Sequence, residues 1–517
     1  MTAPRDIDPI TLEICWTRLV SMVDEAAANL VRAAFSTIVR ECNDYAVVLT
    51  DAQGRLLAQS SYSIPSFICT LPLTVRHFIA KFGADSFKPG DVMITNDPWL
   101  GTGHLPDVNI AVPVFHQGKL VGFAASVAHV PDIGGRLRSP SNREVYEEGL
   151  RITPARLVTD GVTNDTLVTL IEDNVRVNAE VMGDIWAQVS CNRSLAQRLI
   201  DFLDETQLDL DRLGTIMFAR ADAAMRAATK ALPDGDYQNE LLIEGSEGDI
   251  RLKCRLTVRG EEIAIDYEGS SPQVAQAINV VPAYTFAYSA YALKCLLAPE
   301  IPNNDGSFLS IATTAPLGSI LNPRFPASVG ARAMTGHLLP PLIMGALAEV
   351  LPEQVQGAPG SPLWAVQLAG THDGRGFATT FFLNGGQGAL HDRDGLPALS
   401  FPSNLANTPI EVLESRCPVK VLRKEIRRST GGAGAHRGGD GQIFEFRIAA
   451  DSPVTISFMA NRTSFPAPGA RGGEPGQVGV MLADGAPLDP RLVSVLAPGT
   501  VLRLETPGGG GYGPIGA

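Results

Sequence analysis

Two apolar runs separated by a short polar turn decide the local fold: Asp107-Val-Asn-Ile-Ala-Val-Pro-Val114 and Leu120-Val-Gly-Phe-Ala-Ala-Ser-Val-Ala128-His129. Strand-like runs joined by a short glycine-containing turn are typical of a β-hairpin. With Gly118 at the centre, Asp107 and His129 each lie 11 residues from the turn. Residues directly opposite on paired strands have Cβ atoms roughly 4.5–5.5 Å apart. The sequence therefore predicts a hairpin that brings an aspartate and a histidine together at its open end.

A third candidate ligand, His104, lies three residues before Asp107 in a glycine-containing loop. Two imidazoles and one carboxylate with open positions are typical of a catalytic metal site, whereas a structural site is usually closed by four ligands. The alternative is a loop hydrogen bond between His104 and Asp107 without any metal. Histidine is rare, with 8 in 517 residues, and two converge here, which favours the metal. Three other histidines show no such convergence and are interpreted as ordinary surface or core residues: His77, His116 and His391.

Composition limits the class of protein. The chain has 517 residues, of which 45% are hydrophobic, so we expect two or three packed domains with several cores. No apolar run reaches the roughly 18–20 residues of a membrane span, and the N-terminus lacks the pattern of a signal peptide. Seven scattered cysteines without a Cys-x-x-Cys pair favour reduced thiols in the cytoplasm. The formal charge of -13 argues against nucleic acid as a partner.

The order of patterns along the chain predicts an α+β fold with several domains and mixed or antiparallel sheets. Asp8-Pro9 is typical of a capped helix start, and the apolar spacing that follows predicts a long helix. A second hairpin is expected from Tyr45 to Ala58, and Asp44 lies immediately before it. We divide the chain into four regions: an N-terminal α/β region with the candidate site (1–160), a helical segment (161–232), a central α+β region (233–400) and a Gly/Pro-rich β region (401–517).

Within these regions, two or three long helices are expected between residues 165 and 230, and strands between about 238 and 268. Further helices are expected near 273–298 and from Gly336 to Val350. Two glycine-rich loops, 430–441 and 507–513, lack the Lys-Ser/Thr ending of a nucleotide-binding loop. We interpret them as turn and interface segments.

Several unusual strings resemble the hydantoinase B/oxoprolinase family, and the resemblance covers nearly the whole chain. The strings are Asn96-Asp-Pro-Trp-Leu-Gly-Thr-Gly-His-Leu-Pro-Asp107, Ala128-His-Val-Pro-Asp-Ile-Gly-Gly135, Asn322-Pro-Arg-Phe-Pro-Ala327, Thr335-Gly-His337, Asn407-Thr-Pro-Ile-Glu-Val-Leu-Glu414 and the Gly-Gly-x-Gly run at 431–434. The family includes subunits of ATP-dependent hydantoinases and lactamases, the C-terminal half of 5-oxoprolinase, and the metal-bearing subunit of acetone carboxylase-type enzymes.

The resemblance implies roles for individual residues. It places one divalent metal (zinc, manganese or iron) on His104, Asp107 and His129, with Asp44 as a fourth ligand or a base. Many relatives carry a second histidine directly after the position of His129, where this chain has Val130. Asp132, three residues after His129, is expected either to orient an imidazole as a catalytic residue or to cap the turn that it begins.

The resemblance also implies a reaction with two halves. ATP converts a cyclic amide into an O-phosphorylated imidate, and a metal-activated water attacks the activated carbon. Because this chain lacks a convincing ATP-binding motif, we expect a hydantoinase A-type ATP-binding partner subunit in a hetero-oligomer such as α2β2. The substrate is then a hydantoin, an oxoproline-like lactam or a larger lactam. Two alternatives stay open: the metal-bearing subunit of an ATP-dependent carboxylase acting on acetone or acetophenone, and a non-catalytic assembly subunit. The length of the chain favours the hydrolase.

Overall fold

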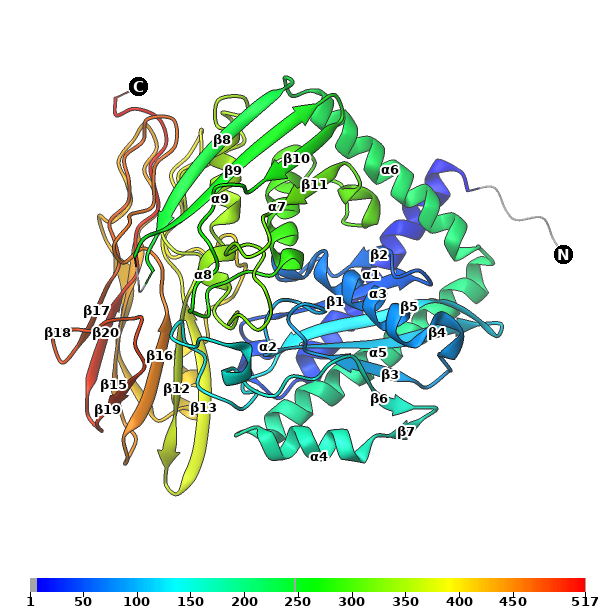
Figure 1. Ribbon diagram of the computed structural model, residues 1–517, viewed down its shortest axis with the longest axis horizontal. Helices are drawn as coiled ribbons and strands as arrows, with labels where there is room; N and C mark the ends of the chain where they lie inside the picture. Colours follow the sequence, from blue (N-terminus) through cyan, green and yellow to red (C-terminus); the bar gives the residue numbers. More distant parts are fainter. Residues whose placement is uncertain (1–6, 246–247, 517) are drawn as a thin grey trace.

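The computed structural model describes residues 7–245 and 248–516 and confirms a mixed α+β fold with several antiparallel sheets. Figure 1 shows the N-terminal sheet and its helices on one side, a central sheet with helices beside them, and the C-terminal strands stacked on the opposite side. The described helices include none that is long and apolar enough to cross a bilayer.

The N-terminal part is built on a seven-stranded sheet in the order β2-β1-β5-β4-β3-β6-β7. Its strands are β1 (Tyr45–Asp51), β2 (Leu56–Gln59), β3 (Val92–Thr95), β4 (Asp107–His116), β5 (Lys119–His129), β6 (Ala155–Thr159) and β7 (Val162–Thr163). Both predicted hairpins are confirmed, and β1 pairs with β5, so the two hairpins lie side by side in one sheet.

The hairpin of β4 and β5 reaches the predicted register by a different route. Its turn has only two residues, Gln117 and Gly118, both with positive φ, which suits the right-handed twist of the strands. Pairing from this turn alone would set Asp107 opposite Ala128. A β-bulge next to Phe115 takes up one extra residue of β5, so that Asp107 faces His129.

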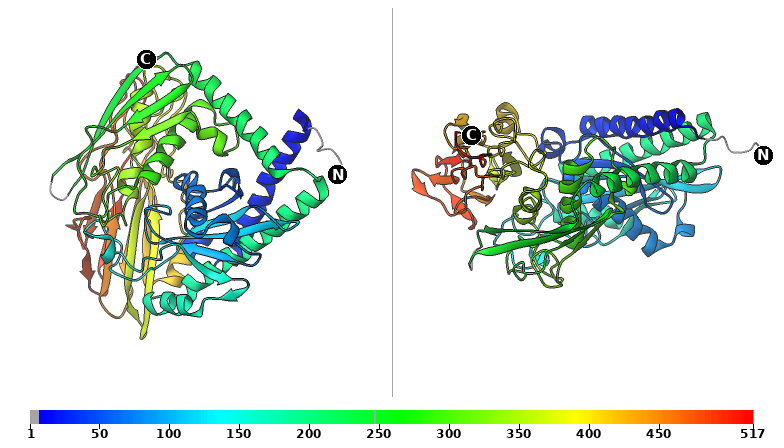
Figure 2. Two further views of the ribbon diagram at one scale, coloured as in Figure 1. Left: turned by 45° about the vertical axis from the view of Figure 1, so that its right-hand side comes forward. Right: turned by 90° about the horizontal axis from the view of Figure 1, so that it is seen from above.

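Helices cover both faces of this sheet. The helix α1 (Pro9–Ala33) begins as predicted, with Asp8 accepting hydrogen bonds from the backbone at its start. It packs with α5 (Asn178–Thr206) on one face of the sheet, and Figure 2 shows the two helices side by side. The other face packs against α3 (Thr70–Phe82) and the central region. The remaining helices of this part are α2 (Thr37–Arg40), α4 (Asp165–Asn174) and α6 (Leu210–Lys230).

The central region contains a four-stranded sheet with helices packed beside it. Its strands are β8 (Gly235–Ile243), β9 (Ile250–Arg259), β10 (Glu262–Asp266) and β11 (Ile311–Thr314). The helix expected near 273–298 begins only at Pro282, as α7 (Pro282–Leu297), because the preceding residues form turns. The helix expected from Gly336 to Val350 begins later and ends earlier than predicted. Gly336 ends the short α8 (Ala333–Gly336), and α9 (Leu339–Leu347) follows.

The C-terminal strands form two sheets that share one apolar core. One sheet, in the order β13-β12-β16-β19, contains β12 (Trp364–His372), β13 (Arg375–Leu383), β16 (Val454–Met459) and β19 (Ser494–Leu496). The other, in the order β14-β15-β20-β17-β18, contains β14 (Val419–Arg427), β15 (Gly441–Ile448), β17 (Val480–Ala483), β18 (Ala486–Pro487) and β20 (Val501–Glu505). The first sheet contains strands from both sides of residue 400, where the sequence predicted a boundary. In chain order, α10 (Ile410–Arg416) lies between β13 and β14.

The two glycine-rich loops pack against each other. The amide of Gly432 donates to the carbonyl oxygen of Gly509 at 2.8 Å. The amide of Gly509 donates to the carbonyl oxygen of Gly439 at 2.9 Å. A Cβ atom added to Gly508 would meet the carbonyl oxygen of Thr430. Glycine is required here because the two backbone segments touch. This contact agrees with the interpretation of the loops as turn and interface segments.

Candidate metal centre

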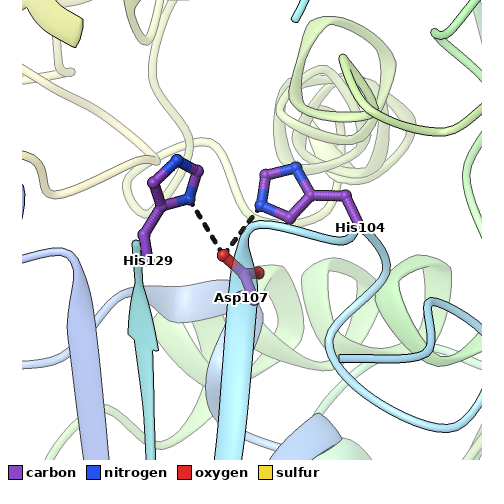
Figure 3. A group of neighbouring side chains, drawn as sticks. All are labelled: His104, Asp107 and His129. Carbon is purple, nitrogen blue, oxygen red and sulfur yellow. Dashed lines mark hydrogen bonds and ion pairs between the residues drawn. The ribbon is translucent and has the colours of Figure 1, made fainter. Parts of the chain in front are cut away.

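Three predicted ligand residues meet at the open end of the hairpin (Figure 3). Oδ1 of Asp107 lies 2.7 Å from Nε2 of His104 and 3.0 Å from Nδ1 of His129. His129 ends β5, Asp107 begins β4, and His104 reaches over from the preceding loop. All three side chains are buried, with at most 4% of any residue exposed. One ligand atom from each lies within 4.8 Å of the others, which is the spacing that a single cation requires.

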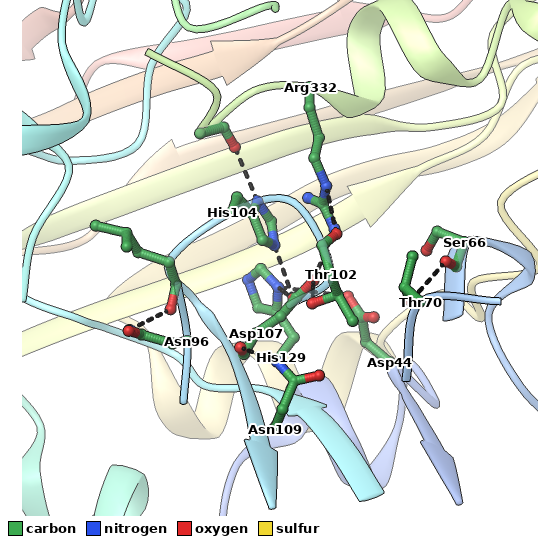
Figure 4. Close-up of polar contacts among 12 residues, drawn as sticks. Asp44, Ser66, Thr70, Asn96, Thr102, His104, Asp107, Asn109, His129 and Arg332 are labelled. Atoms are coloured by element: carbon green, nitrogen blue, oxygen red, sulfur yellow. Dashed lines mark hydrogen bonds and ion pairs between the residues drawn. The ribbon is translucent and has the colours of Figure 1, made fainter. Parts of the chain in front are cut away.

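Asp44 extends this group along the same end of the sheet (Figure 4). Because Tyr45 pairs with Ala128, Asp44 lies opposite His129 on the far side from Asp107. Its backbone carbonyl accepts a hydrogen bond of 3.1 Å from the amide of His129, and its Oδ2 lies 3.8 Å from Nδ1 of that imidazole. Alternation along the strands sends the side chains of this row to the face that packs against the central region.

The central region and the loop before β4 supply the groups that hold Asp107 and His104. Nη2 of Arg332 donates to Oδ2 of Asp107 at 2.6 Å, and the hydroxyl of Thr102 donates to the same oxygen at 2.9 Å. Nε of Arg332 donates to the backbone carbonyl of Thr102 at 3.0 Å. The carbonyl of Gly330 lies 3.0 Å from Nδ1 of His104. These bonds leave Oδ1 of Asp107 directed at the two imidazoles.

Burial controls the protonation of these groups. Burial and then Arg332 lower the pKa of His104 to about 3, while burial and then Arg138 lower the pKa of His129 to about 4. Burial and then the charge of Asp107 raise the pKa of Asp44 to about 7. Burial alone would raise the pKa of Asp107, but His104 and Arg332 outweigh it and hold that pKa well below its usual range. At neutral pH the cluster therefore has two neutral imidazoles and one firmly ionised carboxylate.

The environment of His104 fits a metal ligand. The carbonyl of Gly330 can only accept a hydrogen bond, so the proton of the neutral imidazole lies on Nδ1 and a lone pair lies on Nε2. That lone pair faces the carboxylate of Asp107 at 2.7 Å. Two acceptors at this distance repel each other unless a proton or a cation lies between them. A histidine whose second nitrogen donates to a carbonyl is also the usual arrangement at metal sites.

His129 fits the same cation only after one rearrangement. Nη1 of Arg138 lies 3.2 Å from Nε2 of His129 and can only donate, so Nε2 accepts and the proton lies on Nδ1. For Nδ1 to bind a cation, this proton must move to Nε2 and Arg138 must turn away. Arg138 therefore opposes the tautomer of His129 that can bind a cation through Nδ1. Gly330, in contrast, favours the tautomer of His104 that can bind a cation through Nε2.

A small cavity of about 40 Å³ opens beside the cluster. It has room for a few waters, since one water needs about 10–15 Å³. Its charged or polar walls include Asp44, Arg138 and Arg332, and the apolar part includes Phe382 and Met459. Two buried groups of the wall were not predicted as site residues, namely Tyr284, whose ring packs on Arg332 at 4.3 Å, and His337.

The structure thus brings His104, Asp107 and His129 together with Asp44 beside them, but it places Asp132 elsewhere. Oδ1 of Asp132 pairs with Arg176 at 2.5 Å, and its Oδ2 accepts from the amide of Gly134 at 3.3 Å. These are the contacts of a turn cap. Sequence reasoning missed the two arginines of the cluster, although the string Thr335-Gly-His337 pointed to the right segment for Arg332.

Comparison with known proteins establishes the family. A family model described as hydantoinase B/oxoprolinase matches residues 8–515, so the chain belongs to that family. It is 31% identical to the putative B-type component of the D-/L-hydantoinase of Pseudomonas sp. (strain NS671), over 98% of this chain and 90% of that protein. It is 27% identical to the 5-oxoprolinase of Dictyostelium discoideum, where it spans 41% of the longer protein.

Two solved structures share the fold. The ATP-dependent caprolactamase from Pseudomonas jessenii superposes with a TM-score of 0.91 at 28% identity, over 99% of this chain and 92% of that one. Nucleotide-free acetone carboxylase superposes with a TM-score of 0.85 at 18% identity, over 98% of this chain and 76% of that one. The second likeness shows a common fold alone.

Proposed function

We propose that this chain is the metal-dependent hydrolytic subunit of an ATP-dependent cyclic-amide hydrolase. The observation that carries the proposal is the convergence of His104, Asp107 and His129 on one buried point. Support comes from the caprolactamase, which resembles this chain over 92% of its length. The substrate class is a hydantoin, an oxoproline-like lactam or a larger lactam.

The residues present assign distinct tasks in such a reaction. A divalent metal held by His104, Asp107 and His129 would supply a Lewis acid that lowers the pKa of water toward 7. Arg332 keeps Asp107 ionised and fixed in position. Asp44, with a pKa of about 7, is suited to take a proton from the attacking water at neutral pH. The cavity beside the cluster has room for the attacking water.

The proposed reaction balances with one ATP and two waters. The partner subunit transfers the γ-phosphoryl group of ATP to the amide oxygen and releases ADP. In this chain, water adds to the activated carbon, the C–N bond breaks and the nitrogen takes up a proton, which leaves an acyl phosphate. A second water releases phosphate and the carboxylate of the ring-opened product.

We further propose the partner. The hydantoinase relative is named as one subunit of its enzyme, which supports an A-type ATP-binding subunit for this chain and a hetero-oligomer such as α2β2. Two alternatives are separated by the same experiment: an ATP-dependent carboxylase subunit, in which the metal would stabilise an enolate, and a non-catalytic assembly subunit.

The test is co-expression of this chain with its partner, followed by a panel of hydantoins and lactams with and without ATP and bicarbonate. Ring-opened product that depends on ATP and on metal supports the hydrolase. Incorporation of labelled bicarbonate into a ketone supports the carboxylase instead. A complex that keeps full activity after His129→Ala refutes a catalytic role for the cluster.

A further inference from the structure

A second chamber lies on the other side of His129 from the metal cluster. It has a volume of about 40 Å³, and its wall includes His129, Arg138, Asn142, Glu148 and Gln367. His129 and Arg138 line both cavities, so the two cavities adjoin at these residues. The space suffices for about three waters or one small oxyanion.

The chamber gathers hydrogen-bond donors without a partner. Nε of Arg138, Nδ2 of Asn142 and Nε2 of Gln367 are buried and have no acceptor among the described residues, and Oδ1 of Asn142 is buried there without a donor. Asn142 is 1% exposed and Gln367 is 4% exposed. Buried donors are nearly always paired, because an unpaired one keeps its full desolvation cost. Three such donors around one cavity indicate a ligand rich in oxygen.

Their positions are fixed by separate elements. Gln367 of β12 lies between Thr380 of β13 and Ser457 of β16 in the register of the C-terminal sheet. The hydroxyl of Ser457 donates to the backbone carbonyl of Arg138 at 2.6 Å, which ties the loop after β5 to that sheet. The chamber is therefore built where the N-terminal and C-terminal parts meet.

The charge of Arg138 points to an anion. Within the described ranges, no carboxylate lies within 4.0 Å of its guanidinium, whereas Arg332 is paired with Asp107 at 2.6 Å. Buried charges are normally paired, since an uncompensated one is costly. The charges of Asp44 and Asp107 reach Arg138 only from beyond that distance, and a bound anion would supply a counter-charge in direct contact with it.

Glu148 narrows the choice of anion. Its Oε1 accepts from the amides of Val329 and Gly330, each at 2.7 Å, and from the hydroxyl of Ser328. Its Oε2 is buried without a donor among the described residues. A carboxylate oxygen in an anion site repels a fully deprotonated oxyanion but accepts a hydrogen bond from a protonated one. Monohydrogen phosphate and protonated phosphoryl groups meet this condition, whereas sulfate does not.

We propose that this chamber binds a protonated phosphoryl group, which Arg138, Asn142 and Gln367 hold by its oxygens and Glu148 by its proton. The inference rests on the proposed function, in which the phosphoryl group arrives on the activated amide and leaves as phosphate. The chamber would hold that group next to the cavity in which the carbon reacts. Two sources of the same chemistry are possible: the phosphoryl group of the substrate and free phosphate.

The experiment is calorimetric titration of the full chain, with metal and after chelation, with inorganic phosphate, sulfate and phenyl phosphate. We expect phosphate to bind at least about tenfold more tightly than sulfate, with or without metal, as one charge-assisted hydrogen bond implies. Arg138→Gln should weaken phosphate binding about tenfold or more, and Glu148→Gln should bring sulfate to parity with phosphate. Arg143→Gln, an exposed arginine of the same loop, is the matched control and should change neither. Phenyl phosphate tests whether the chamber accepts a phosphoryl group attached to an organic substrate. If inorganic phosphate binds and phenyl phosphate does not, the chamber binds the free phosphate product.

If Arg138→Gln does not fold, as judged by thermal unfolding, Gln367→Met removes one donor without a charge and should weaken phosphate in the same direction. The inference is overturned if phosphate does not bind, if it binds no better than sulfate, or if it is lost with the metal. Phosphate selectivity that persists in a complex inactive on every lactam would keep the chamber and refute the proposed function. Metal-dependent lactam turnover, with phosphate binding unaffected by these substitutions, would support the proposed function and refute the phosphoryl site in the chamber.

Discussion

Asp107 and His129 face each other across β4 and β5 only because a β-bulge next to Phe115 shifts the pairing that the two-residue turn would otherwise set. A shift by one residue sends every side chain of a strand to the opposite face. The bulge therefore decides whether the three ligand residues share one point. Asp44 joins the row from β1 through the regular pairing of β1 with β5.

Two glycines of this hairpin should respond differently to alanine. At Gly118, a Cβ has open space, and only the positive φ of 77° is unfavourable, which costs about 1 kcal/mol. At Gly122, a Cβ would lie 2.2 Å from the carbonyl oxygen of Thr50 and would force β1 from β5, with a cost of about 3 kcal/mol. Denaturant unfolding of both variants checks this. Equal destabilisation would show that the close approach of β1 and β5 is not as described.

Arg332→Met should destabilise the metal-free protein by about 3–5 kcal/mol, because it leaves the buried carboxylate of Asp107 without its cation. A metal bound at the cluster supplies positive charge at the same carboxylate. Added metal should therefore raise the melting temperature of Arg332→Met more than that of the unmodified protein. An equal rise in both would contradict a metal bound through Asp107.

Arg138→Gln should strengthen metal binding about tenfold, although it removes a polar contact to a ligand. Glutamine can accept the proton of Nε2 of His129, which favours the form whose Nδ1 is free for the metal, and one positive charge leaves the site. Titration of the metal-stripped protein measures the affinity. Weaker binding than in the unmodified protein would mean that Arg138 supports the ligand form.

A prediction about pH concerns Lys294 at the end of α7. Its ammonium donates to the carbonyls of Ala298 and Ile301, and burial lowers its pKa to about 8 from 10.5. Between pH 8 and 10.5 the unfolded chain binds the proton that the folded chain has lost, so this group makes stability rise with pH. The free energy of unfolding of the unmodified protein should gain a contribution from this group between pH 7.5 and pH 10, and the Lys294→Met variant should lack that contribution. The same slope in both proteins would exclude Lys294 as its source.

The parts of the site that follow from local pairing were predictable. Asp107 and His129 are joined by a single hairpin, and the alternation of its strands indicates which residues share a face. Arg332 was not predictable, because its partner Asp107 comes from a distant segment, and Arg138 was not predictable, because a lone arginine has no distinctive spacing even in the loop that follows His129. Asp132 shows the limit of spacing itself, since a residue three positions from a ligand served the turn and Arg176 instead.

The helices show the same contrast. The cap at Asp8 and the apolar stripe after it placed α1 correctly, because both are local signals. The helix expected from Gly336 to Val350 is present with different bounds, because α8 ends at Gly336 and α9 extends only from Leu339 to Leu347. Apolar residues there are buried on all sides, so their pattern carries no period that marks a helix boundary.

The central claim is that a single divalent cation binds where His104, Asp107 and His129 meet, and the most direct test is a metal titration of the stripped protein beside its Asp107→Asn variant. Asparagine keeps the shape of the side chain but removes the charge, so the variant should lose more than about 100-fold in affinity, more than the loss of a residue that only supports a ligand. The variant also leaves Arg332 without its counter-charge and should be less stable, so the titration uses protein shown to be folded. His116→Ala, at the turn end of the same hairpin, is the control. We predict one equivalent of metal per chain for the unmodified protein and the control, and none for Asp107→Asn at the same concentration. One equivalent bound by a folded Asp107→Asn protein would contradict the account.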